Sequence, residues 1–196
     1  MADLPIELEA ALEGRLAHAL DIEGKIPRAF EALGPVSGRD VLLVDGIVDG
    51  LRSRQLGDLG GRVSVGSLAS AADDSADVVL SCWSAFRGPD PLEIAEATRI
   101  LRPGGRLLVL HDYGRDDVAR LRGDLTEYGL WSRRDGPFLR GGFKVRVIHC
   151  FWTFDSIEDA QAFLDAAFGE KGRAVGAEMT RPRLAYNVAV YHRTFE

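Results

Sequence analysis

Apolar runs and stretches of helical spacing follow one another along the chain, and their order predicts an α/β fold. Val41–Val44, Asp77–Leu80 and Leu107–Leu110 are short runs made mainly of β-branched residues and leucine. Such runs are typical of strands that are buried on both faces of a sheet. Residues 90–102, between the last two runs, carry apolar side chains at helical spacing. A strand, a helix and a strand in that order imply a right-handed parallel crossover.

The helix predicted over residues 90–102 has clear signals at both ends. Asp90 is a candidate N-cap, Pro91 takes the first helical position, and Glu93 is placed to complete the capping arrangement. Pro103-Gly104-Gly105 follows the last turn and is expected to stop the helix. These signals make it the best-defined helix of the sequence.

Other segments complete the pattern. Helices are expected near residues 8–20, 22–33, 51–59 and 116–128 and from Ser156 onward, and strands over 62–65, 143–154 and 184–192. No repeat or linker separates these elements, so we expect one domain over residues 1–196 with a doubly wound, mostly parallel sheet. Residues 1–40 would form N-terminal helices, 41–113 the core, and 114–196 the C-terminal helices and a closing hairpin. The first helices would either cover the edge of the sheet as a lid or pack against its face.

Charge and apolar content narrow the range of functions. A formal net charge of -6 and a pI of about 5.3 oppose non-specific attraction to a phosphate backbone, so we expect no nucleic acid as a partner. No apolar stretch approaches the length that spans a membrane, and we expect no membrane association. Residues 1–12 carry Asp3, Glu7 and Glu9 in place of a basic stretch, which is unlike a signal peptide. These features predict a cytoplasmic protein.

The cysteine and lysine content adds little chemistry. Cys82 and Cys150 are the only cysteines and have apolar neighbours, so neither a disulfide framework nor a zinc-ligand spacing is present. We therefore expect no metal site. Only three of the 24 basic residues are lysine, a bias that suggests a GC-rich, bacterial genome.

Two segments carry a specific resemblance to a known family. Residues 99–110, RILRPGGRLLVL, closely resemble the passage into the fifth strand of class I S-adenosylmethionine-dependent methyltransferases of the type 11-like group. Residues 73–81 are similar to the loop and fourth strand of the same family. Val41–Gly50 takes the place of its first strand and glycine loop, so the resemblance covers about 70 residues. It implies a Rossmann-like fold, S-adenosylmethionine as cofactor, and transfer of a methyl group to a small molecule.

The glycine loop of the family is only partly present. The family has an acidic residue followed by G-x-G-x-G, because side chains at this turn would block the nucleoside cofactor. Here residues 44–50 read VDGIVDG, so Gly46 and Gly50 match the first and last glycines while Val48 replaces the middle one. Val44 stands at the acidic position, and Asp45 comes one residue late. By strand alternation Asp45 points to the opposite side unless the strand end is bulged.

The first half of the predicted sheet is short. Only 26 residues, 51–76, separate the glycine loop from the next buried run, whereas one strand-helix-strand unit needs roughly 30 residues. We therefore expect one strand and one helix to be missing and the sheet to have fewer than seven strands. The strand over 62–65 ends in Gly66-Ser67, without the carboxylate that the family's second strand offers to the ribose hydroxyls. If it corresponds to the third strand, Ser67 replaces an acid near the adenine amino group.

Candidate functional residues follow the carboxyl ends of the predicted strands, where ligands bind in this architecture. The resemblance makes the cofactor-binding candidates Asp45, Gly46, Asp49, Gly50, Ser67, Ser81 and Trp83. The catalytic candidates are His111, Asp112 and Tyr113, because methyl transfer often needs a base that takes a proton from the acceptor.

Structural roles explain the same residues. A tight turn selects glycine by itself, and Asp45 and Asp49 can be turn or N-cap residues. Trp83 can fill the core beneath the following loop as readily as it can stack on a ligand. Asp112 can cap the next helix, and His111 can be a strand histidine with satisfied hydrogen bonds.

Two functions are therefore open. The first is an S-adenosylmethionine-dependent methyltransferase acting on a small molecule. The second is a methyltransferase-like protein that has lost the cofactor and serves as a binding, regulatory or oligomerising domain. The aromatic strand with Phe151, Trp152 and Phe154 is either the edge of a homodimer or core packing. The two missing carboxylates are the feature that separates these functions.

Overall fold

The computed structural model describes residues 3–123, 125 and 127–196. They form a six-stranded sheet in the order β2-β1-β3-β4-β6-β5. Its strands are β1 (Asp40–Val44), β2 (Arg62–Gly66), β3 (Ala76–Cys82), β4 (Leu101–Asp112), β5 (Lys144–Thr153) and β6 (Arg183–Thr194). Strands β1 to β4 pair in parallel, and β6 pairs antiparallel with both β4 and β5. The predicted α/β fold, with a mostly parallel sheet of fewer than seven strands, is confirmed.

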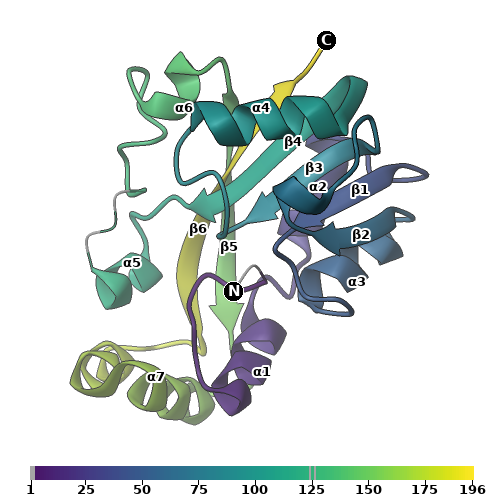
Figure 1. The fold of residues 1–196 in the computed structure, drawn as a ribbon. Helices are drawn as coiled ribbons and strands as arrows, with labels where there is room; N and C mark the ends of the chain where they lie inside the picture. The colour runs from purple at the N-terminus through teal and green to yellow at the C-terminus, as the bar shows by residue number, and fades with distance from the viewer. Residues whose placement is uncertain (1–2, 124, 126) are drawn as a thin grey trace.

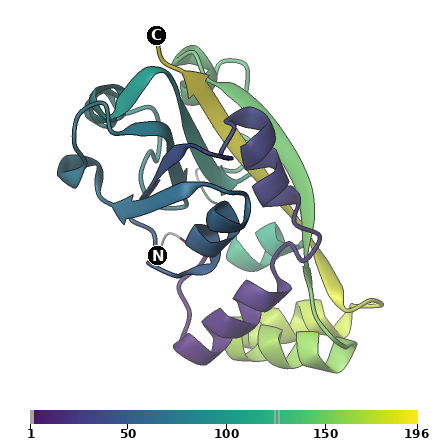
Figure 2. The same ribbon diagram turned by 90° about the vertical axis from the view of Figure 1, so that its right-hand side faces the viewer.

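Helices cover both faces of the sheet (Figures 1 and 2). They are α1 (Ala10–Ala19), α2 (Lys25–Leu33), α3 (Leu51–Asp58), α4 (Pro91–Ile100), α5 (Asp117–Arg122), α6 (Pro137–Arg140) and α7 (Ile157–Ala177). Buried side chains of α4 and α6 belong to one core cluster, and those of α1, α2, α3, α5 and α7 belong to the other. The N-terminal helices α1 and α2 thus pack against the sheet.

The central strands divide their side chains between these two cores. In β1, Val41 and Leu43 belong to one core, whereas Leu42 and Val44 belong to the other. Because successive side chains of a strand point to opposite faces, a strand covered on both sides must be apolar throughout. In β5, the buried Trp152 lies in the core with Phe163 of α7 at 6.2 Å between ring centroids. Core packing therefore accounts for this aromatic side chain.

Helix α4 begins as predicted but is held differently. Asp90 caps it, since its Oδ1 accepts hydrogen bonds from the N–H groups of Leu92 at 2.8 Å and Glu93 at 3.3 Å. Glu93 does not close a capping box. Its carboxylate accepts from the backbone N–H of Phe86 at 3.0 Å instead and fixes the loop before the helix. The helix ends at Ile100, and β4 starts at once, so the predicted Pro-Gly-Gly stop lies inside the strand.

Two other helices are shorter than predicted. The helix expected over 22–33 begins at Lys25, because the Asp21 carboxylate accepts from the backbone N–H of Lys25 at 3.1 Å and of Ile26 at 2.6 Å. The helix expected over 116–128 ends at Arg122, where Gly123 adopts a left-handed φ of 78°. Residues 124 and 126 of that prediction lie outside the described residues.

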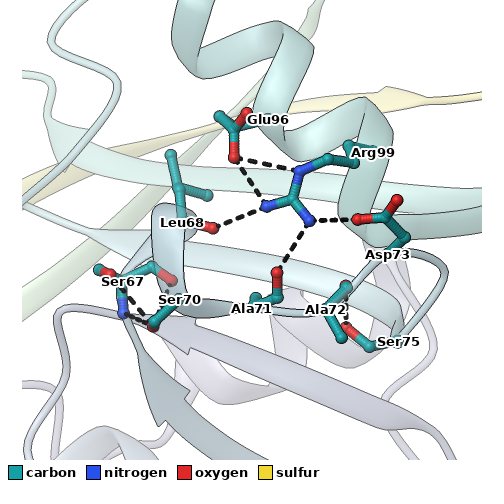
Figure 3. A network of polar contacts seen from close by, with 9 residues as sticks. All are labelled: Ser67, Leu68, Ser70, Ala71, Ala72, Asp73, Ser75, Glu96 and Arg99. Carbon is teal, nitrogen blue, oxygen red and sulfur yellow. Dashed lines mark hydrogen bonds and ion pairs between the residues drawn. The ribbon is translucent and has the colours of Figure 1, made fainter.

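The connection from β2 to β3 has no α-helix, only the short 3-10 turn Leu68–Ser70 and a loop. Figure 3 shows how Arg99 of α4 holds this connection. Its guanidinium donates to the carbonyls of Leu68 at 3.1 Å and Ala71 at 2.8 Å, and to the carboxylates of Asp73 at 2.5 Å and Glu96 at 2.7 Å. The connection between β2 and β3 is thus a loop, and Arg99 holds this loop against α4.

Candidate functional site

The carboxyl ends of β1, β3 and β4 meet at one edge of the sheet, where α/β proteins of this kind bind ligands. We call this edge the strand-end site; it comprises residues 45–50, 81–84 and 111–113, together with any side chain that packs on them. The structure brings its three segments together. Ser84 Oγ donates to the Val44 carbonyl at 3.3 Å, and Trp83 Nε1 donates to Asp112 Oδ1 at 2.9 Å. Ser67 follows β2, is exposed, and pairs with Ser70.

The turn after β1 places its two aspartates in solvent. Asp45 and Asp49 both adopt left-handed φ angles, 53° and 57°, and both side chains are exposed. Asparagine and aspartate tolerate this conformation better than most residues. A Cβ at Gly46 would collide with the Leu43 side chain, so the core beneath the turn already requires glycine there. A role of these residues in binding a cofactor stays a prediction.

Asp3 lies against the last glycine of this turn. A Cβ at Gly50 would collide with the Asp3 carboxylate, and the backbone of Ile47, Leu51 and Arg52 lowers the pKa of that carboxyl. Leu51 and Arg52 open α3, and the N-terminus of a helix favours negative charge. Burial nevertheless raises the pKa of Asp3, which is only 4% exposed.

Arg52 points inward from α3 and is fully buried, at 0% exposure. Its Nη1 donates to Gln55 Oε1 at 2.7 Å. Its Nε and Nη2 have no hydrogen-bond partner among the described residues. The guanidinium carbon lies 5.2 Å from the centre of the Trp83 ring, and its charge acts on the Asp3 carboxylate. A buried guanidinium with open donors is energetically costly, so this arrangement calls for an explanation.

Trp83 and Ser81 are buried in the loop after β3. Trp83 is 8% exposed, belongs to the core, and adopts a left-handed φ of 52°, which is uncommon for a bulky residue. Ser81 Oγ contacts Ser84 Oγ and the Ala85 carbonyl, both at 3.1 Å. The structure therefore gives both residues structural partners, and their predicted contact with a cofactor is not tested.

Asp112 is buried and surrounded by hydrogen-bond donors. Besides Trp83, the Tyr186 hydroxyl donates to its Oδ1, while the Arg122 guanidinium and the Tyr128 hydroxyl, at 3.5 Å, donate to its Oδ2. Burial raises the pKa of the Asp112 carboxyl, and the charge of Arg122 opposes that rise. The donors occupy both carboxylate oxygens. Asp112 therefore ties β3, β4 and β6 together and does not cap the next helix, which begins at Asp116 and Asp117.

His111 is buried beside the same strand end. Its Nε2 lies 3.1 Å from the Phe86 carbonyl, and its ring packs edge-on against Trp131 at 4.9 Å between centroids. Burial and the nearby charge of Arg87 lower the pKa of His111 to about 4. A neutral imidazole results at pH 7, but it has no solvent-exposed surface. Tyr113, the third catalytic candidate, is half-buried under the Arg115 guanidinium.

Two further observations limit the chemistry of the described residues. They hold no cluster of three or more His, Cys, Asp or Glu side chains that could bind a metal ion. Of their helices, none has both the length and the apolar character needed to cross a membrane. Surface grooves lie between α2 and β5 and along α3 and β2, and neither groove includes Trp83, His111 or Asp112 in its lining.

No family model and no curated protein sequence matches this chain. Solved structures do resemble it. A candidate type II methyltransferase from Anaeromyxobacter dehalogenans has a TM-score of 0.54 at 17% identity, over 86% of this chain and 95% of that chain. A candidate methyltransferase from an antibiotic biosynthesis pathway of Anabaena variabilis ATCC 29413 has a TM-score of 0.53 at 14% identity, over 89% of this chain and 98% of that chain. This chain has the class I methyltransferase fold. Identity this low establishes the fold alone.

The strand-end site of this methyltransferase-fold chain does not fit S-adenosylmethionine in the arrangement described. The cofactor needs open space at the glycine turn and an acceptor for the ribose hydroxyls. Asp3 fills the space at Gly50, and the end of β2 presents the Ser67 hydroxyl in place of a carboxylate. Asp112, a second buried carboxylate of the site, has donors on both oxygens. A cofactor would have to displace the chain's own groups.

Several residues that build the site carry no recognisable signal in the sequence. Asp3 stands in a segment that belongs to no helix or strand, and Arg52 lies in the first turn of a helix that is otherwise mostly polar. Tyr186 lies 74 residues beyond Asp112 along the chain. Only the three-dimensional pairing of β4 with β6 brings that tyrosine to the site.

Proposed function

We propose that this chain is a methyltransferase-fold binding protein whose strand-end site does not take S-adenosylmethionine. The observation that carries the proposal is the position of Asp3. Its carboxylate lies on Gly50, and the backbone at the start of α3 lowers the pKa of this carboxyl, at the place where a cofactor would approach the chain. A site filled by the chain's own carboxylate favours a protein that has kept the fold and changed its ligand.

The catalytic candidates support the same proposal. A general base must reach the proton that it removes, directly or through one water. The His111 imidazole and the Asp112 carboxylate are both buried, and the Asp112 oxygens already accept from Trp83, Tyr186 and Arg122. Neither group therefore has a free path to a methyl acceptor. The contacts of both residues support a structural role, because Asp112 connects β4 with Trp83 and with Tyr186 of β6, and His111 contacts Phe86 and Trp131.

A second function, an S-adenosylmethionine-dependent methyltransferase acting on a small molecule, is favoured by one observation. Gly46 and Gly50 lie in a turn directly after a central parallel strand, in a chain with the methyltransferase fold. This function requires the segment that contains Asp3 to leave the turn. His111 to Tyr113 would then be the residues closest to the acceptor, as the sequence predicts.

Calorimetric titration with S-adenosylmethionine and with S-adenosylhomocysteine distinguishes the two functions. The proposal predicts no binding tighter than about 1 mM for either compound, from protein whose circular dichroism shows that it is folded. Micromolar binding that disappears in the Gly50→Trp variant would contradict the proposal and favour the methyltransferase. Gly57→Trp is the matched control, since a Cβ at Gly57 meets nothing within 4 Å and the residue lies on α3, the helix that follows Gly50.

A further inference from the structure

Among the described residues, Arg52 is the buried side chain with the most nitrogen or oxygen atoms that lack a hydrogen-bond partner. A guanidinium carries five N–H donors in a planar fork, and here Nε and Nη2 have no partner among the described residues. The side chain is fully buried, and one bond to Gln55 is its described hydrogen bond. Leaving a charged group buried without partners is strongly unfavourable. The open donors of Arg52 therefore indicate a ligand that accepts hydrogen bonds from them.

The start of α3, beside Arg52, already lies against a carboxylate. The Asp3 Oδ2 atom would collide with a Cβ at Gly50, and the backbone of Ile47, Leu51 and Arg52 lowers the pKa of this carboxyl. The other carboxylate oxygen, Oδ1, is buried without a partner among the described residues. The peptide chain ties Asp3 to its neighbours, so its carboxylate reaches the turn and leaves the fork of Arg52 open. A free carboxylate has no such tether and can meet both the turn and the fork.

We propose that Arg52, the N-terminal turn of α3 and the ring of Trp83 form a binding site for a small aromatic carboxylic acid, with Asp3 as the internal group that the ligand displaces. The planar fork of arginine matches the two oxygens of a carboxylate. The Trp83 ring, whose centre lies 5.2 Å from the Arg52 guanidinium carbon, supplies a flat apolar wall. A carboxylate in the turn and an aromatic surface beside it together define this class of ligand.

Displacing Asp3 would move the N-terminal segment away from the turn. Residues 3–8 belong to no helix or strand, so moving them breaks no regular element. Leu4, which is buried with Asp3, would leave the core at the same time, and the aromatic ring of the ligand would replace part of that apolar contact. The inference rests on the proposed function, since it assigns the strand-end site to a ligand other than S-adenosylmethionine.

Titration of the full chain with benzoate at constant ionic strength tests the site, with benzyl alcohol as the probe that keeps the ring and lacks the carboxylate. We expect saturable binding of benzoate and none of benzyl alcohol. Asp3→Ala should tighten benzoate binding about tenfold, because the variant removes the internal competitor. Arg52→Gln should weaken it about tenfold or more, as expected for the loss of a charge-assisted hydrogen bond.

Arg54→Gln is the matched control for charge. Arg54 lies on the same helix, is exposed, and donates to the Asp49 carbonyl at 2.6 Å, so this variant should bind benzoate like the wild type. The inference is overturned if wild type and Asp3→Ala bind benzoate equally, or if Arg54→Gln weakens binding as much as Arg52→Gln. The Asp3→Ala comparison decides the matter even if Arg52→Gln does not fold. S-adenosylhomocysteine, titrated in parallel, reports separately on the proposed function.

Discussion

Two arginines, Arg99 and Arg52, have opposite surroundings. The Arg99 side chain is 30% exposed, and its guanidinium donates to two backbone carbonyls and two carboxylates. Arg52 is fully buried, and two of its nitrogens have no partner among the residues that the structure describes. Burial makes partners more necessary, because water can no longer supply them. Arg99, which water can still reach, therefore has many hydrogen-bond partners, whereas Arg52, which water cannot reach, has open donors.

This contrast separates structure from function. Arg99 holds the loop between β2 and β3 against α4 (Figure 3), and these contacts account for the presence of the arginine. The contacts of Arg52 do not account for it. Most buried polar and charged groups of a natural protein have partners, and exceptions to such rules tend to occur at functional sites. On this ground the strand-end site, and not the Arg99 network, is where a ligand is expected.

Asp112 extends this comparison, because both of its carboxylate oxygens accept hydrogen bonds, so that it resembles Arg99 in having several partners. Asp112→Ala would leave the half-buried Arg122 guanidinium and the buried Tyr186 hydroxyl without their acceptor. Removing one partner of a buried ion pair costs about 3–5 kcal/mol, so we expect a loss of that size in the free energy of unfolding measured in urea. Asp73→Ala, which removes an exposed partner of Arg99, should cost about 0–1 kcal/mol. Similar losses in both variants would show that Asp112 is not a structural centre.

His111 supplies a pH test of the same buried edge. Its pKa falls from 6.5 in the unfolded chain to about 4 in the folded protein. Below pH 6.5 the unfolded state therefore binds a proton that the folded state does not, so stability declines as the pH falls from 6.5 toward 4. The full decline is about 3 kcal/mol. Urea unfolding of His111→Asn should lack this part of the decline, whereas His18→Asn, exposed on α1, should keep it. Parallel profiles for the wild type and His111→Asn would contradict the prediction.

Substitutions at Gly50 and Gly57 distinguish the turn that Asp3 fills from the open surface of α3. Gly50→Ala places a Cβ 2.8 Å from Ile47 Cβ, 2.9 Å from the Ile47 carbonyl, and against Asp3. We expect a loss of about 1–3 kcal/mol in unfolding free energy from overpacking. Gly57→Ala, in α3 with nothing within 4 Å, should instead gain about 0.5–1 kcal/mol from helix propensity. Thermal unfolding reports both signs, and a neutral Gly50→Ala would mean that Asp3 does not hold the turn closed.

Periodicity predicts the elements of this fold well, because each buried strand is a continuous apolar run. The strand expected at Val41–Val44 and the Asp90 cap are observed. Helix ends are less predictable, since Asp21 and Gly123 set them through local hydrogen bonds and backbone angles. The site is the least predictable part. A sequence pattern selects Asp112 but cannot reveal that distant residues saturate it.

The same limit applies to the residues that fill the turn. Asp3 belongs to a segment without helical or strand periodicity, and its contact with Gly50 spans most of the N-terminal region. Arg52 has the helix propensity of any surface arginine. Nothing in a single sequence distinguishes a solvated arginine from a buried one. The places of Asp3 and Arg52 in the strand-end site therefore follow from the packing alone.

Unfolding free energies of Arg52→Met and Arg99→Met test most directly the claim that Arg52 is retained at the expense of stability. Arg52→Met removes a buried, open guanidinium and keeps an apolar side chain of similar length, so we expect a gain of about 1–2 kcal/mol. Arg99→Met removes the bonds to Leu68 and Ala71 and should lose about 1–2 kcal/mol. Opposite signs are the predicted result. A loss of stability in both variants would show that Arg52 is a structural residue like Arg99 and would contradict the account.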